Sequence, residues 1–106
     1  MTTLSAEFKA KIANIYIKNR EKMEKLDPNI MESFSSEILD VINKEKKKSD
    51  TVHDLELLEY NMGLLRTYSY NLKHYTPETD EYDFTQNDCK NVVDSTKKWL
   101  SLEGLI

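Results

Sequence analysis

The chain has 106 residues, and its 15 basic and 19 acidic side chains give a formal net charge of -4. This length allows one domain, 1–106, and 2 Gly with 2 Pro are too few for the turns of an all-β sandwich. No apolar run approaches the ~18 residues of a membrane span, and no secretory signal is visible, so we expect a cytoplasmic protein without membrane contact. The single cysteine, Cys89, rules out an internal disulfide framework.

Apolar residues recur at helical spacing along most of the chain and predict an all-α, four-helix antiparallel bundle of the up-down type. The first predicted helix covers about 5–26, with Ser5 as its N-cap. The second covers about 28–47, where Asp27 caps the first turn and Pro28 fits it.

The third predicted helix, about 52–75, has the strongest periodicity, and Thr51–Asp54 resembles a capping box before it. Gly63 inside this helix suggests a close approach of a neighbouring helix. Residues 76–84 are expected to form an acidic loop, which either crosses the bundle diagonally or joins neighbours. The fourth helix, about 86–103, is then expected to end at Gly104.

The charge distribution disfavours nucleic acid as a partner. The chain holds 13 lysines but only 2 arginines, and arginine is the usual grip on phosphates and bases. Residues 1–53 carry +1 and residues 54–106 carry -5, so the two halves differ enough to orient a charged partner. The exception is a cluster of lysines at the end of the second helix, which keeps a nucleic-acid-associated subunit open as one alternative: Lys44, Lys46, Lys47 and Lys48.

The sequence contains no recognisable catalytic, cofactor or metal motif, so we expect that the protein is not an enzyme and needs no cofactor. His53 and His74 are separated by about 30 Å of helix, too far to share a metal ion within one chain. Cys89 allows two interpretations. A position in the first turn of the fourth helix would lower its pKa, whereas a buried position would make it an inert apolar residue.

The third helix carries more apolar surface than one packing seam requires. A second stripe of apolar and aromatic residues lies beside its core stripe, and Arg66 lies near it. Either this helix is central and all of the surface is buried within the bundle, or part of it binds a partner. For the partner surface we select five residues of this helix and its end: Tyr60, Leu64, Arg66, Tyr68 and Tyr75.

The predicted acidic loop is the second candidate for partner contact, because its carboxylates alternate with aromatic rings. Its selected residues are Glu78, Asp80, Glu81, Tyr82 and Asp83. Together these features predict a non-catalytic protein–protein interaction module: a small regulator, adaptor or complex subunit that binds a second copy of itself or a basic protein. A further alternative is an acidic inhibitor or immunity-type protein that neutralises a basic partner.

Overall fold

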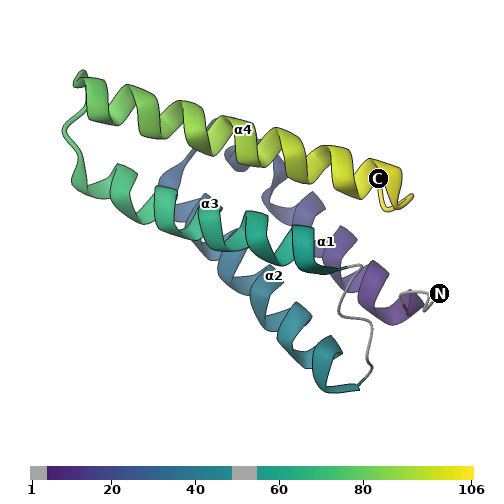
Figure 1. Cartoon of the computed structure of the whole chain (residues 1–106). Coiled ribbons are helices and arrows are strands. Elements are labelled where there is room, and N and C mark those ends of the chain that lie inside the picture. The colour runs from purple at the N-terminus through teal and green to yellow at the C-terminus, as the bar shows by residue number, and fades with distance from the viewer. Residues whose placement is uncertain (1–4, 49–54) are drawn as a thin grey trace.

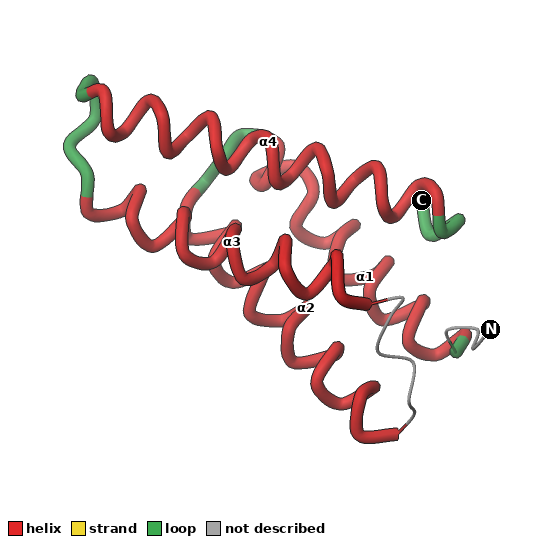
Figure 2. Tube along the Cα trace, in the orientation of Figure 1, coloured by secondary structure: helices red, strands yellow, loops and turns green. Residues whose placement is uncertain are grey.

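The computed structural model describes residues 5–48 and 55–106, and these form an antiparallel bundle of four helices (Figure 1). The helices are α1 (Ala6–Glu24), α2 (Pro28–Lys48), α3 (Glu56–His74) and α4 (Asp80–Leu102). The described residues contain no strand (Figure 2). The bundle measures 46 × 22 × 19 Å. The predicted fold class, an all-α four-helix bundle, is therefore confirmed.

The four helices do not pack equally. α3 packs extensively against α2 and α4, α1 packs mainly against α2, and the seam between α1 and α4 is the least packed of the four. The third helix therefore has two principal neighbours rather than three. Residues 75–79 join α3 directly to the adjacent α4, so this connection does not cross the bundle diagonally (Figure 1).

The core is a single cluster along the axis of the bundle. Its largest fully buried side chain is Tyr16, whose ring meets Phe34 edge-on at a centroid distance of 6.3 Å. α1 also buries Phe8, Ile12 and Met23. Burying the Tyr16 ring between α1 and α2 removes a large apolar area from water, which stabilises the contact between them.

The first two helices begin where the capping residues predict. The Ser5 hydroxyl accepts a hydrogen bond from the Phe8 amide at 3.1 Å. Asp27 Oδ1 accepts from the Asn29 amide at 3.0 Å and from the Ile30 amide at 3.4 Å. These bonds satisfy amides that have no partner inside a helix, so a local sequence signal is sufficient to fix both starts.

The predicted start of the fourth helix is wrong. α4 begins at Asp80 rather than near residue 86, and the acidic segment that was expected as a loop forms its first turn. Its N-cap is Thr79, whose hydroxyl accepts from the Tyr82 amide at 3.3 Å. Acidic side chains are favourable at this position because the first turn of a helix carries a partial positive charge. The acidity that suggested a solvated loop therefore supports a helix start.

Two glycines behave differently from each other. Gly63 is exposed, and a Cβ added there would meet no atom within 4 Å, so the expected close helix approach is wrong. Gly104 ends α4 as predicted, with a φ of +74° that favours glycine. The Leu105 amide donates to the Leu100 carbonyl at 2.8 Å, which completes a Schellman motif. The predicted capping box at Thr51–Asp54 lies outside the described residues, as does His53.

Candidate interaction surface

The seam between α3 and α4 is marked by a hydrogen bond between polar side chains. Asn61 Nδ2 of α3 donates to Ser95 Oγ of α4 at 3.2 Å. Asn61 is buried and Ser95 is exposed, so this bond lies where the packed interior of the seam meets its outer surface. Residues three, four or seven positions away on either helix share a side with these two residues. The bond therefore locates the two outer stripes described next.

The outer stripe of α3 contains most of the predicted helical contact residues. Tyr60 is 65% exposed and Leu57 is 54% exposed, while Tyr75, just beyond the end of the helix, is 39% exposed. Leu64 and Tyr68 are half-buried and pack against the core at the base of the same stripe. The spacing from Leu57 to Leu64, Tyr68 and Tyr75 is 7, 4 and 7 residues, which keeps these side chains on one side.

A matching stripe follows the flank of α4 that adjoins α3. Its members recur at alternating spacings of four and three residues, and all are exposed: Phe84, Asp88, Asn91, Ser95, Lys98 and Leu102. Phe84 is 71% exposed and Leu102 is 77% exposed. Neither residue was predicted from the sequence. Phe84 had been assigned to a loop, where residue spacing does not show which side chains share a face. Leu102 does not follow the spacing of the buried residues of the fourth helix.

The two stripes form one surface along the outer α3/α4 seam, which we call the α3/α4 face. Because the helices are antiparallel, the beginning of α3 lies near the end of α4 (Figure 1). By their positions in the chain, Leu57 and Tyr60 are therefore at the Leu102 end of the face, and Tyr75 is at the Phe84 end. Among the described residues, five of the eight exposed large apolar side chains belong to this face. This concentration distinguishes the face from the scattered apolar exposure that is normal on a protein surface.

Arg66 does not belong to the α3/α4 face, although the sequence placed it with the tyrosines. It lines a shallow pocket with Glu32, Thr67 and Tyr70 on the side of α3 that adjoins α2. On this side α3 is tied to α2 by ion pairs, one between Lys73 Nζ and Glu32 Oε2 at 2.9 Å and one between Lys46 and Glu59. Sequence spacing placed residues on α3 but gave no information about which neighbouring helix each side would meet.

The acidic residues selected from the sequence lie together at the beginning of α4. Glu78, Asp80, Glu81 and Asp83 are all exposed, whereas Tyr82 is half-buried against the core. Thr79 Oγ1 donates to the Thr76 carbonyl at 2.7 Å, which fixes the turn before them. The carboxylates therefore project from a defined helix end at the Phe84 end of the α3/α4 face.

The lysine cluster is partly neutralised within the chain. Lys44 pairs with Asp40 at 3.1 Å, and Lys46 pairs with Glu59 across the α2/α3 seam. Lys47 is exposed, and the side chain of Lys48 lies outside the described residues. Because both ion pairs reduce the positive potential at this helix end, the structure adds no support to the nucleic-acid alternative.

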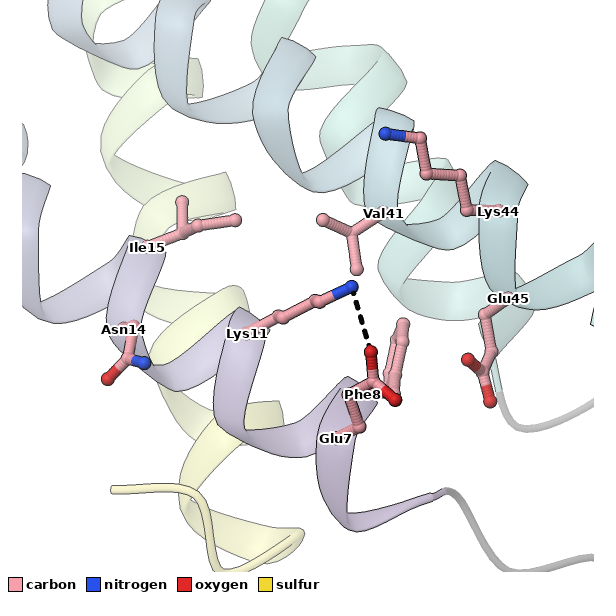
Figure 3. Close-up of a pocket in the computed structure, with 8 residues that line it drawn as sticks. All are labelled: Glu7, Phe8, Lys11, Asn14, Ile15, Val41, Lys44 and Glu45. Atoms are coloured by element: carbon pink, nitrogen blue, oxygen red, sulfur yellow. Dashed lines mark ion pairs between the residues drawn. The ribbon is translucent and has the colours of Figure 1, made fainter.

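A groove of about 350 Å³ lies between the beginning of α1 and the end of α2 (Figure 3). Phe8, Ile15 and Val41 form its apolar wall, and charged residues of both helices form its rim. Lys11 pairs with Glu7 one turn earlier on α1, with Nζ 3.2 Å from Oε1 (Figure 3). The rim carries both signs of charge in equal number, with Glu7 and Lys11 on α1 and Lys44 and Glu45 on α2, so it favours neither anions nor cations.

Cys89 lies ten residues into α4 and is fully buried, so the interpretation that placed it in the first helical turn is wrong. Burial raises its pKa from 9.0 to about 11, although a hydrogen bond with Ser69 opposes the change. A thiol with this pKa remains protonated near neutral pH and is a poor nucleophile.

The described residues contain no group of three or more His, Cys, Asp or Glu side chains placed to hold a metal ion. Within the same ranges, no helix has the length and apolar character required to cross a membrane.

Comparison of the chain with models of known families, with curated proteins and with solved structures found no match.

Proposed function

We propose that this protein is a non-catalytic protein–protein interaction module that binds its partner through the α3/α4 face. It would serve as a small regulator, adaptor or complex subunit. The proposal depends above all on the exposure of Leu57, Tyr60, Tyr75, Phe84 and Leu102 along one seam. Aromatic residues are favoured at interfaces because they bury a large ring at a small entropic cost, and tyrosine keeps its hydroxyl hydrated.

The chain offers a matched pair of residues for testing this proposal. Tyr60 and Tyr70 are both on α3 and are 65% and 55% exposed, but only Tyr60 belongs to the α3/α4 face. Tyr70 instead stacks on His74 at a centroid distance of 4.4 Å. Truncating either ring therefore removes a similar exposed area from a different side of the same helix.

The experiment is quantitative affinity capture from a native lysate with three baits: the unchanged chain, Tyr60→Ala and Tyr70→Ala. We expect a specific partner to be retained by the unchanged bait and by Tyr70→Ala, and to fall by about tenfold or more with Tyr60→Ala. Circular dichroism of each bait checks that the bundle is intact. Equal recovery on all three baits would contradict the proposed surface.

The exposed carboxylates in and just before the first turn of α4 favour a second candidate, an acidic inhibitor or immunity-type protein that neutralises a basic partner. None of Glu78, Asp80, Glu81 and Asp83 forms an ion pair with another described residue. Binding dominated by these groups would weaken steeply between ~50 mM and ~500 mM salt, because salt screens exposed charges. Binding through the aromatic rings would change little over the same range, so a salt series separates the two candidates.

A further inference from the structure

The exposed stripe of α4 is chemically complementary to a second copy of itself that runs in the opposite direction. Its six residues, in order, are apolar, acidic, amide, hydroxyl, basic and apolar: Phe84, Asp88, Asn91, Ser95, Lys98 and Leu102. Position 93 lies midway between the two residues of each of three pairs. Phe84 and Leu102 are both apolar, Asp88 and Lys98 have opposite charges, and Asn91 and Ser95 both form hydrogen bonds.

We infer that the partner of the α3/α4 face is a second copy of this chain, whose α4 packs antiparallel against the first about a two-fold axis near position 93. This inference rests on the proposed function. The alternating spacing of four and three residues is the spacing of a two-helix packing seam. In an antiparallel pair, each residue of one copy faces the residue of the other copy that lies equally far from the axis on the opposite side along the sequence. A two-fold axis repeats every contact, which is the usual symmetry of homodimers.

The side chains required at each layer are available. Phe84 and Leu102 are 71% and 77% exposed, so pairing each with its counterpart would remove apolar area from water at both ends of the seam. Asp88 and Lys98 are exposed and have no ion-pair partner among the described residues. Ser95 Oγ already accepts a hydrogen bond from Asn61 Nδ2, so its own hydroxyl hydrogen is free to donate to the Asn91 amide oxygen of the second copy.

Charge along the helix selects the antiparallel arrangement over the parallel one. On this stripe the acidic group lies towards the beginning of α4 and the basic group towards its end. A parallel pair would place Asp88 against Asp88 and Lys98 against Lys98, whereas the antiparallel pair places each against its opposite. α4 lies along one edge of the bundle, where none of the other three described helices covers its outer side (Figure 1). A second α4 therefore has access to the stripe.

The decisive test reverses the two charges singly and together. Sedimentation equilibrium should show concentration-dependent dimers for the unchanged chain. Asp88→Lys and Lys98→Asp should each weaken the dimer by about tenfold or more, because each creates two like-charge contacts. The double variant D88K/K98D should restore the unchanged affinity, because the pairs reform with exchanged partners. Both residues are exposed, and circular dichroism confirms that each variant retains its helices.

Cysteine cross-linking tests the direction of pairing. In a Cys89→Ala background that still dimerises, a mixture of Asp88→Cys and Lys98→Cys chains should form a disulfide-linked dimer under mild oxidation. Asp88→Cys alone should not, because two copies of residue 88 would lie about 15 Å apart along the seam. Cross-linking of Asp88→Cys with itself, or failure of the double charge swap to restore the dimer, would overturn the antiparallel assignment.

The failure of this inference is distinguishable from failure of the proposed function. A monomer at concentrations up to about 1 mM would rule out the second copy as the partner. The comparison of Tyr60→Ala with Tyr70→Ala would still show whether the α3/α4 face binds a different protein. Only equal behaviour of those two variants would remove the interaction surface itself.

Discussion

Asn61 on α3 and Ser95 on α4 are joined by a hydrogen bond of 3.2 Å, which links the two helices that carry the proposed interaction surface. The bond sets the register of the two outer stripes, because it fixes which turns of α3 and α4 lie side by side. The amide of Asn61 is buried, so losing its partner leaves a polar group with fewer compensating contacts.

A double-mutant cycle should detect this bond as a coupling between the two side chains. Ser95→Ala should lower the free energy of unfolding by about 1 kcal/mol because it leaves the buried Asn61 amide without its partner, and loss of the bond through Asn61→Ala should cost somewhat less because water can hydrate the exposed Ser95 hydroxyl that remains. The double variant should lose less than the sum, with a coupling of about 0.5–1 kcal/mol in urea denaturation. Purely additive losses would show that the two groups act independently.

The start of α4 can be tested by comparing two threonines. Thr79→Ala removes the hydroxyl that caps the Tyr82 amide and should cost about 1 kcal/mol of stability. Thr85 lies inside the helix and has no capping role, so Thr85→Ala should change stability by less than about 0.5 kcal/mol. Thermal or chemical denaturation of both variants measures the difference. The reverse order of effects would indicate that the helix begins near residue 86.

The two glycines should respond in opposite directions to the same substitution. Gly63→Ala should raise the free energy of unfolding by about 1 kcal/mol, because alanine favours the helix and its methyl group meets open space. Gly104→Ala should lower it by about 1 kcal/mol, because φ is +74° at that residue and a side chain is strained there. Urea denaturation of both variants gives the comparison. Destabilisation by Gly63→Ala would imply a neighbour that the bundle does not place there.

Cys89 should be unreactive in the folded chain and should make stability depend on alkaline pH. Its pKa is raised from 9.0 to about 11, chiefly by burial, so the folded state holds the thiol proton that the unfolded state releases. The stabilisation is therefore complete below pH 9 and is lost as the pH rises towards about 11, by an amount on the order of 2 kcal/mol.

Two measurements check this behaviour. At pH 8 the thiol should react with a disulfide reagent such as DTNB much more slowly in the folded chain than in ~8 M urea. Between pH 8 and 10.5, the unchanged chain should lose stability relative to Cys89→Ala, a difference that cancels the contributions of other groups, such as Tyr16. Rapid labelling of the folded chain, or a parallel pH dependence of the two chains, would contradict a buried protonated thiol.

The parts of the fold that the sequence predicted are those controlled by short-range signals. Ser5 and Asp27 mark the starts of α1 and α2 because a cap acts on amides two or three residues away. The start of α4 was misplaced because Asp80, Glu81 and Asp83 are typical both of a solvated loop and of a first helical turn. Composition alone does not separate these two environments.

The sequence predicted only part of the candidate surface, and the reason is related. The spacing of Tyr60, Leu64 and Tyr68 correctly placed them on one side of a helix, since that depends only on the helical period. Separating Arg66 from them requires the position of α2, and adding Phe84 requires the true start of α4. Both depend on how the helices assemble in space, which is a long-range property of the chain.

The unequal packing of α4 has a consequence for how the molecule tolerates change. One flank of this helix is firmly joined to α3, while the other meets α1 loosely, with an ion pair between Lys97 and Glu24 at 3.2 Å. Substitutions that alter the contact between α1 and α4 should therefore leave the packing of α3 against α4 unchanged. The α3–α4 hairpin, with α2 packed extensively against α3, would keep its position while α1 adjusts.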